Sequence, residues 1–233
     1  MLQQTQVDRV VPRWHRFLER FPTVEVCAGA GPAEVIDEWS GLGYNRRAVS
    51  LHRLATVVAG EHGGRFPTDR PGLQDLPGVG PYTARAVRVF ALEEADAVLD
   101  TNVARILART AGRTLARAEA QALADANLGP SPWHHNQAML DVGAGWCRPR
   151  NPSCDRGCPF RPVCRWAAGG RPDPDPASGS AAVSARQSRF EGSDRQGRGR
   201  LVEALRSGPV ARDRLATTMG WPDDADRADR VAA

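Results

Sequence analysis

The sequence of 233 residues contains no lysine, so each of its 31 basic side chains is an arginine. A chain without lysine cannot use a lysine Schiff base as a covalent intermediate. No apolar run approaches the ~20 residues that a membrane-spanning helix needs. The first residues, MLQQTQVDRVV, lack the basic region and apolar stretch of a secretory signal. These absences exclude Schiff-base chemistry and argue against membrane and secreted proteins, so we expect a cytoplasmic location.

The sequence also has few runs in which apolar and polar residues alternate, the pattern of a half-buried strand. Apolar residues recur instead at helical spacing, and 41% of the chain is hydrophobic, enough for a packed core. The expected helices cover residues 1–20, 32–40, 46–60, 70–75, 81–92, 101–110, 116–126 and 132–145. We therefore predict an all-α fold.

The last third of the chain changes in composition. Residues 169–187, GGRPDPDPASGSAAVSARQ, are rich in proline, glycine and serine and predict a linker with little to bury. Residues 188–233 predict a short accessory segment with two short helices, too small for a confident independent core. Because this segment ends in an Asp-rich stretch, we expect it to be truncated.

The most specific local motif is LPGVGPYTA, residues 76–84, between two expected helices. Two glycines in such a turn let the backbone approach a ligand, and the free N–H groups at the start of the next helix can bind a phosphate. This is how a helix-hairpin-helix grips the DNA backbone without reading the base sequence. The net charge is +4, and the fixed positive charges are all on arginine side chains. This charge is compatible with DNA as a partner. An ordinary turn between helices, with glycine as a C-cap, is the alternative.

An aspartate follows the hairpin by twenty residues, in the stretch VLDTNVARILAR. Asp100 stands directly before an expected helix, where an N-cap is the ordinary interpretation. The functional interpretation is a carboxylate that stabilises an oxocarbenium-like sugar while an N-glycosidic bond breaks. Asn102 is placed to orient this carboxylate.

Four of the five cysteines fall within eighteen residues, at Cys147, Cys154, Cys158 and Cys164, whereas Cys27 stands alone. Such a cluster in an intracellular chain indicates metal ligation rather than disulfides. Four thiolates can hold either a [4Fe–4S] cluster or a tetrahedral zinc ion. The wide, uneven spacing favours the iron–sulfur cluster, in a stabilising role, and leaves zinc as the alternative.

Taken together, these motifs resemble those of the adenine-specific (A/G mismatch) DNA glycosylases of the helix-hairpin-helix glycosylase superfamily. The resemblance runs from Met1 to about Trp166 and is carried by MLQQTQV, WSGLGYNRRAVSLH, FPTDRPGLQDLPGVGPYTARAV, VLDTNVARILAR, NQAMLDVGAGWC and the cysteine loop. It implies a glycosylase domain over residues 1–168, with a six-helix-barrel subdomain, a cluster subdomain around residues 147–164 and an active site in the cleft between them.

The resemblance also implies roles for individual residues. Lyase-type members carry a catalytic lysine where this chain has Tyr82, so it implies a monofunctional glycosylase. Asp100 would stabilise the cationic sugar, with Asn102 and Tyr82 in the same pocket. The DNA-binding residues implied are Gln4 and Tyr44, which would enter the base stack, and the hairpin residues Leu76, Gly78, Val79, Gly80 and Thr83. Gln137 would contact the flipped adenine, and the four clustered cysteines would ligate the cluster.

The chain departs from the family pattern in three places. The family's general acid is a glutamate two residues before the methionine that aligns with Met1, so we expect the domain to be N-terminally incomplete and this chain to bind DNA with crippled catalysis. The gap between Cys154 and Cys158 holds three residues where the family usually has two. The family's C-terminal Nudix-like domain, which reads 8-oxoguanine, has no evident equivalent.

The function predicted from the sequence is removal of adenine mispaired with guanine or 8-oxoguanine in double-stranded DNA, during base-excision repair, by a monomeric, nucleoid-associated enzyme of bacterial type. Two alternatives stay open. One is a related glycosylase of different base specificity. The other is a non-catalytic, cluster-bearing protein that binds mismatched DNA.

Overall fold

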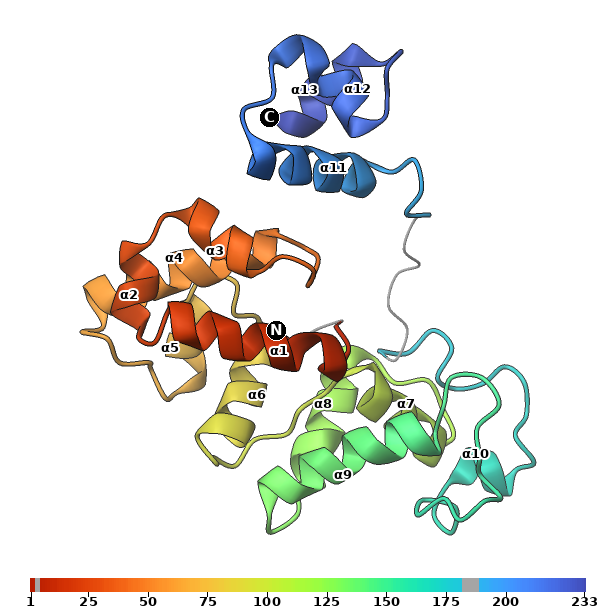
Figure 1. Ribbon diagram of the computed structural model, residues 1–233. Helices are drawn as coiled ribbons and strands as arrows, with labels where there is room; N and C mark the ends of the chain where they lie inside the picture. Colours follow the sequence, from red (N-terminus) through yellow and green to blue (C-terminus); the bar gives the residue numbers. More distant parts are fainter. Residues whose placement is uncertain (3–4, 182–188) are drawn as a thin grey trace. The chain divides into compact units, whose positions relative to one another are not determined.

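A computed structural model describes residues 1–2, 5–181 and 189–233, and these residues form two compact units, 1–184 and 185–233 (Figure 1). The described residues contain helices, turns and loops but no strand, which confirms the all-α prediction. None of the described helices is both long and apolar enough to cross a membrane. Each unit is described below by itself.

The first unit holds ten helices among its described residues. They are α1 (Val7–Arg20), α2 (Val24–Gly29), α3 (Pro32–Glu38), α4 (Arg46–Glu61), α5 (Arg70–Asp75), α6 (Pro81–Ala91), α7 (Thr101–Ala111), α8 (Arg117–Ala126), α9 (Pro132–Gly145) and α10 (Arg165–Ala168). Helix α2 was not predicted, because its six residues are too few to show a helical period. The prediction for residues 1–20 is correct only from Val7 onward.

Helices α1 to α4 pack around one apolar core. Phe17 and Val10 of α1 face inward with Val35 of α3 and Trp39, while α4 contributes Ala48 and Ala55. The hydroxyl of Thr23 caps α2 by accepting from the Val26 N–H, 3.3 Å away. This part of the fold carries the loop before α4 and the residues at the chain's beginning.

Helices α5 and α6 form the predicted hairpin and share a second core with α4, built from Leu54, Val58, Leu73, Leu76 and Ala84. Asp69 caps α5 through the Gly72 N–H at 2.9 Å. Pro81 is the first residue of α6, where a missing N–H costs nothing because the first turn has no carbonyl partner for it. The tight turn between these helices is therefore supported from both ends.

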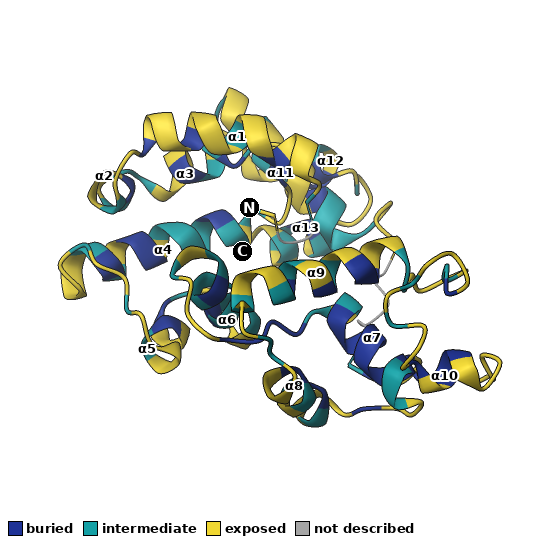
Figure 2. Ribbon diagram, turned by 90° about the horizontal axis from the view of Figure 1, so that it is seen from below, coloured by how far each residue is buried: buried dark blue, intermediate teal, exposed yellow. Residues whose placement is uncertain are grey.

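Helix α7 is the centre of the remaining part of the unit, and Figure 2 shows it buried along most of its length. It packs against α8, α9 and α10. The buried stretch Asp96–Leu99 leads into it without regular secondary structure. The side chain of Asn136, on α9, supplies hydrogen bonds to the backbone of this stretch. It accepts from the Val98 N–H at 2.7 Å and donates to the Asp96 carbonyl at 2.9 Å.

The segment that follows α10 differs from the linker expected over residues 169–187. Its described residues up to 181 are part of the first unit, and Pro176, Ala177 and Ser180 are buried there. The physical reason is that Asp175 forms an ion pair with Arg109, a partner 66 residues earlier that composition cannot reveal.

The second unit contains α11 (Asp194–Ser207), a 3₁₀ turn (Arg212–Arg214), α12 (Leu215–Met219) and α13 (Ala225–Ala232). The structure thus has three helices in this unit where two were predicted. All three contact one another around Leu201, Ala216, Met219 and Ala228. These four residues form a separate hydrophobic core. The sequence had led us to expect that this segment is too small for an independent core, and the structure differs on this point.

Candidate active site and cysteine centre

Asp100 occupies the position before α7 and holds its carboxylate in two hydrogen bonds. Oδ1 accepts from the backbone N–H of Val103 at 2.7 Å, and Oδ2 accepts from the side-chain amide of Asn102 at 3.1 Å. The first bond is an N-cap, which places the negative charge at the positive end of the helix. The predicted N-cap is therefore present, and the same contacts fix the carboxylate in one orientation.

Tyr82, on the first turn of α6, lies close enough to Asp100 to respond to its charge. Burial of the phenol raises the pKa of Tyr82, and the negative charge of Asp100 raises it further. The hydroxyl group therefore stays protonated at neutral pH and can act as a hydrogen-bond donor. The structure thus brings Tyr82, Asp100 and Asn102 together, as the sequence predicts.

Behind Asp100, the side chain of Asn102 is itself held by a buried arginine. The Asn102 side-chain oxygen accepts from Arg105 Nη2 at 2.6 Å, and the same nitrogen donates to the Gly143 carbonyl at 2.9 Å. Arg105 Nε also donates to the carbonyl of Cys147 at 2.5 Å. A chain of hydrogen bonds therefore connects Asp100 to the backbone of the first clustered cysteine.

Gly143 makes this arrangement possible because it allows α9 to approach α7 closely. A Cβ atom at this position would lie 2.5 Å from the Asn102 Cβ and 3.3 Å from its Cα. Contacts below 3.0 Å do not occur for real Cβ atoms. The absence of a side chain at Gly143 therefore sets the distance between the two helices at Asn102.

The two glycines of the hairpin turn have different structural roles. Gly78 has a φ of +81°, and a Cβ there would lie 2.6 Å from the Ser50 Cβ on α4. Gly80 caps α6, is exposed, and would place a Cβ in open space. Gly78 is thus required by the protein's own packing, whereas Gly80 leaves the start of α6 open to an outside ligand.

The other hairpin residues divide in the same way between packing and surface. Leu76 is 2% exposed and packs in the core with Leu54 and Leu73, so its side chain supports the hairpin, and its predicted contact with DNA stays a prediction. Its carbonyl accepts from the Val79 N–H at 3.1 Å and closes the turn. Val79 and Thr83 are half-buried, near the start of α6.

Of the two predicted DNA-stacking residues, the structure describes Tyr44. Gln4 lies outside the described residues. Tyr44 is exposed, with a φ of +52°, in the loop before α4. Arg47 joins this loop to the beginning of the chain by donating to the carbonyls of Met1 and Leu42, at 3.3 and 3.1 Å, and to the Thr5 hydroxyl at 3.1 Å. The residues flanking Gln4 are therefore fastened beside the Tyr44 loop.

Gln137 is half-buried on α9, and its side-chain amide donates to Asp141 Oδ1 at 3.0 Å, one turn along the same helix. The next residue toward the N-terminus, Asn136, is the buried group that fastens the stretch leading to Asp100. The predicted contact of Gln137 with adenine stays a prediction.

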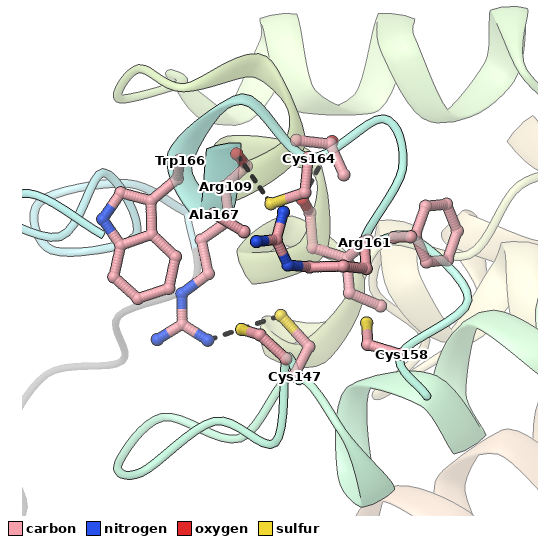
Figure 3. A pocket seen from close by; sticks show the side chains of 11 residues that line it. Arg109, Cys147, Cys158, Arg161, Cys164, Trp166 and Ala167 are labelled. Atoms are coloured by element: carbon pink, nitrogen blue, oxygen red, sulfur yellow. Dashed lines mark hydrogen bonds between the residues drawn. The ribbon is translucent and has the colours of Figure 1, made fainter. Parts of the chain in front are cut away.

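The four clustered cysteines line a single cavity, together with apolar side chains of α7 and α10 (Figure 3). Cys154 and Cys164 are buried, while Cys147 and Cys158 are half-buried. Among the described residues, no three His, Cys, Asp or Glu side chains converge closely enough to hold a metal ion as they stand. The donor set of four thiols around one cavity nevertheless has the chemistry of a cluster or zinc site.

Arg109 points into the same region and supplies positive charge next to the thiols. Its Nη1 donates to Cys147 Sγ at 3.4 Å, and the Cys164 thiol donates to its carbonyl at 3.4 Å. Burial raises the pKa of Cys147, and the nearby Arg109 and Arg105 guanidinium groups oppose that rise. The two arginines thus favour the thiolate form that a metal requires.

Sequence reasoning missed four residues of this region: Arg105, Arg109, Asn136 and Gly143. A signal existed for the arginines, since both lie in the otherwise apolar stretch of α7 and are spaced by one helical turn. No local pattern identifies Gly143 or Asn136, because their roles depend on contacts with residues at least 38 positions away.

Comparison with known proteins agrees with this geometry. Residues 1–127 match the family model described as HhH-GPD superfamily base excision DNA repair protein. The chain is 40% identical to the adenine DNA glycosylase of Mycolicibacterium smegmatis, over 99% of this chain and 78% of that protein. It is 39% identical to the Homo sapiens adenine DNA glycosylase, over 71% of this chain and 32% of that protein. Among solved structures, it resembles a thermostable thymine-DNA glycosylase with a TM-score of 0.68 and 28% identity, over 72% of this chain and 80% of the other.

Proposed function

This chain belongs to the adenine DNA glycosylases of the HhH-GPD superfamily of base excision DNA repair proteins, and we propose that it removes adenine mispaired with guanine or 8-oxoguanine in double-stranded DNA. It is a DNA glycosylase, so the bond it hydrolyses joins a base to its sugar. The observation that carries the proposal is the Asp100 carboxylate, fixed by Val103 and Asn102 beside the hairpin.

In the proposed reaction the target nucleotide is extruded from the duplex, because its glycosidic bond cannot be reached within the stack. The bond between C1′ and the base then breaks, with the electron pair leaving on a base that gains a proton from solvent. A water molecule adds to C1′, returns one proton to solvent and leaves an abasic site. Asp100 stabilises the positive charge that develops on the sugar between these two events.

The structure supports this role for Asp100 because its carboxylate is already oriented before substrate arrives. A charge held by a backbone N–H and an amide does not have to reorganise as the transition state forms, which is the condition for effective electrostatic stabilisation. The protonated hydroxyl of Tyr82 lies in the same region and would donate a hydrogen bond to the sugar or its phosphate.

DNA binding is supported by the hairpin and by the loop of Tyr44. The surface at Gly80 is open and lies directly before α6, and the start of a helix suits a backbone phosphate. Tyr44 is exposed on a loop that Arg47 ties to Met1 and Thr5, so this loop would present Tyr44 to the base stack. We expect the protein to bind duplex DNA as a monomer.

We further propose that Cys147, Cys154, Cys158 and Cys164 hold a [4Fe–4S] cluster, with zinc as the alternative. The support is the shared cavity and the two buried arginines that offset thiolate charge. When bound, the cluster would cross-link the four thiolates and fix the conformation of residues 147–164. Iron and zinc analysis of the purified protein, with its visible absorption spectrum, distinguishes the two metals.

The test is single-turnover glycosylase activity on duplexes with adenine opposite 8-oxoguanine, guanine or thymine, followed by alkaline cleavage of abasic sites. We expect any product to come from the first two duplexes, and no strand break without alkali, since the chain has no lysine for lyase chemistry. Product only from a duplex with another damaged or mispaired base would favour the alternative specificity.

Asp100→Asn is the matching variant, because asparagine caps a helix as well as aspartate does, while the charge and the oxygen that accepts from the Asn102 amide are lost. We expect the single-turnover rate to fall at least about 10²-fold with DNA affinity retained. Asp69→Asn, at the cap of α5, is the control and should leave the rate unchanged. If Asp100→Asn keeps the full rate, the carboxylate is only a cap and the proposed mechanism is wrong.

A further inference from the structure

The segment after α10 makes a specific set of contacts around the cysteine cavity, unlike a linker. We define residues 172–181 as the clasp. Its first carbonyl, of Pro172, accepts from the Trp166 indole N–H at 2.9 Å, and its last residue, Ala181, donates its N–H to the Leu115 carbonyl at 3.3 Å. Both ends of the clasp are therefore hydrogen-bonded to earlier residues of the first unit.

Between these ends, Asp175 meets Arg109 in a two-pronged ion pair. Asp175 Oδ2 lies 2.5 Å from Arg109 Nη2, and Oδ1 lies 3.1 Å from Nε. Asp175 Oδ1 also accepts from the Ala177 N–H at 2.9 Å, which turns the chain and buries Ala177. This geometry is the planar, bidentate pairing that arginine makes with carboxylates and that lysine cannot make.

Arg109 is 2% exposed, so its charge is almost entirely removed from water. Its remaining donors reach Cys147 Sγ at 3.4 Å and the carbonyls of Arg148 and Pro149 at 2.9 and 3.4 Å. Its guanidinium carbon also lies 4.5 Å from the centre of the Trp166 ring. One buried cation thus joins the cysteine loop, α10 and the clasp.

Asp175 is the only carboxylate within ion-pair distance of Arg109 among the described residues. Burial alone would raise the pKa of Asp175, but hydrogen bonds from Arg109 and Ala177 and the charge of Arg109 hold it below its ordinary value. Without that carboxylate, Arg109 would lose its partner in a buried ion pair, which is strongly unfavourable. Arg109 would then have to draw water into the cavity wall or leave its place.

From these contacts we propose that the clasp is a latch for the cysteine centre, in which Asp175 is a positioning residue that holds Arg109 against Cys147 and keeps the bound cluster shielded from solvent. This inference rests on the proposed metal role of the four cysteines. It assigns to residues 172–181 the protection of the cluster, and it does not require any part in the glycosidic reaction.

The test compares Asp175→Asn with Asp173→Asn in the full chain. Asp173 lies on the same clasp, is exposed and forms no ion pair with the residues that the structure describes, so its replacement shows the effect of losing an aspartate that holds no partner there. The first measurement is the rate at which visible absorbance and protein-bound iron are lost in the presence of a ferrous-iron chelator. We expect this rate to rise about tenfold in Asp175→Asn and to stay at the wild-type value in Asp173→Asn.

The second measurement does not depend on the cluster. Hydrogen exchange of the Ala177 and Ala181 amides, followed by mass spectrometry of the peptides that contain them, should be several-fold faster in Asp175→Asn. Asp175→Glu, which keeps the charge, should give values near the wild type in both measurements. If Asp175→Asn does not fold, Asp175→Ser, which also removes the charge, takes its place.

The outcomes separate the two proposals. Wild-type protein without bound iron or zinc would contradict the proposed cysteine centre, while the exchange experiment would still show whether Asp175 holds the clasp. Metal-loaded wild type with no faster metal loss in Asp175→Asn would overturn the latch and leave the proposed glycosylase function untouched. Faster exchange without faster metal loss would also overturn it, because the clasp would then open without exposing the centre.

Discussion

Replacement of Gly143 by alanine tests whether the spacing between α7 and α9 controls the orientation of Asp100. The new Cβ would lie 2.5 Å from the Asn102 Cβ, whereas ordinary van der Waals contact begins at 3.4 Å. The helices must therefore separate by about 0.9 Å at this point or Asn102 must move. Either movement strains the bonds from Arg105 Nη2 to the Gly143 carbonyl and to Asn102, at 2.9 and 2.6 Å.

The expected effects on stability and on rate differ in size. Overpacking of this kind costs about 1–3 kcal/mol, and the better helix propensity of alanine returns about 1 kcal/mol, so the loss of stability should not exceed about 2 kcal/mol. A displacement near 1 Å in a catalytic group can cost ~10²-fold in rate, or about 2.7 kcal/mol of transition-state stabilisation. We therefore expect Gly143→Ala to fold, bind mispaired duplex, and cleave the glycosidic bond about 10²-fold more slowly.

The assay is single-turnover glycosylase kinetics with denaturant unfolding of the same preparations. Gly145→Ala is the matched control, because it lies on the same helix and nothing stands within 4 Å of its Cβ position. This control should keep the wild-type rate. The reasoning is refuted if Gly143→Ala cleaves at the wild-type rate, or if Gly145→Ala slows the reaction equally.

Two further predictions follow from buried or constrained backbone. Asn136→Leu leaves the Val98 N–H and the Asp96 carbonyl without the Asn136 side chain as their partner. The free energy of unfolding, measured by urea titration, should therefore fall by about 2–4 kcal/mol. A fall of less than about 1 kcal/mol would show that water replaces the amide. Gly78→Ala should lower the melting temperature, because Gly78 has a φ of +81° and its Cβ would meet Ser50. Gly80→Ala should leave the melting temperature unchanged and weaken binding to duplex DNA in a fluorescence anisotropy titration. Equal melting temperatures for the two variants would contradict the different structural roles of the two glycines.

Local signals were enough to predict most of the fold. The helix over residues 46–60 shows its apolar face in the sequence and appears as α4, and the hairpin follows from a proline and two glycines whose backbone requirements are local. Asp100 was predicted from its place before a helix, since an N-cap needs only its own helix. Such features depend on residues within a turn of one another, so the sequence displays them directly.

Features that depend on distant contacts could not be predicted in this way. The apolar residues of α1 fit one helix, yet Phe17 is buried while Val11, Trp14 and Leu18 are exposed, and only packing against α3 decides which face turns inward. The clasp was predicted as a linker because its composition is that of a linker, whereas its contacts with Arg109, Trp166 and Leu115 all join it to distant residues or to the helix before it. Short segments of low hydrophobicity are ordered when one of their charges meets a buried counter-charge.

The arginine-only composition has a structural consequence in α7. Arg105 and Arg109 lie one turn apart, and each uses its planar group in at least three directions: Arg105 reaches Asn102, Gly143 and Cys147, while Arg109 reaches Cys147, the following loop carbonyls and Asp175. A lysine has one nitrogen and could not replace either side chain without leaving buried carbonyls unpaired. Arginine therefore suits both positions, because the side chains between Asp100 and the cysteine cavity must supply several hydrogen-bond donors from one rigid group.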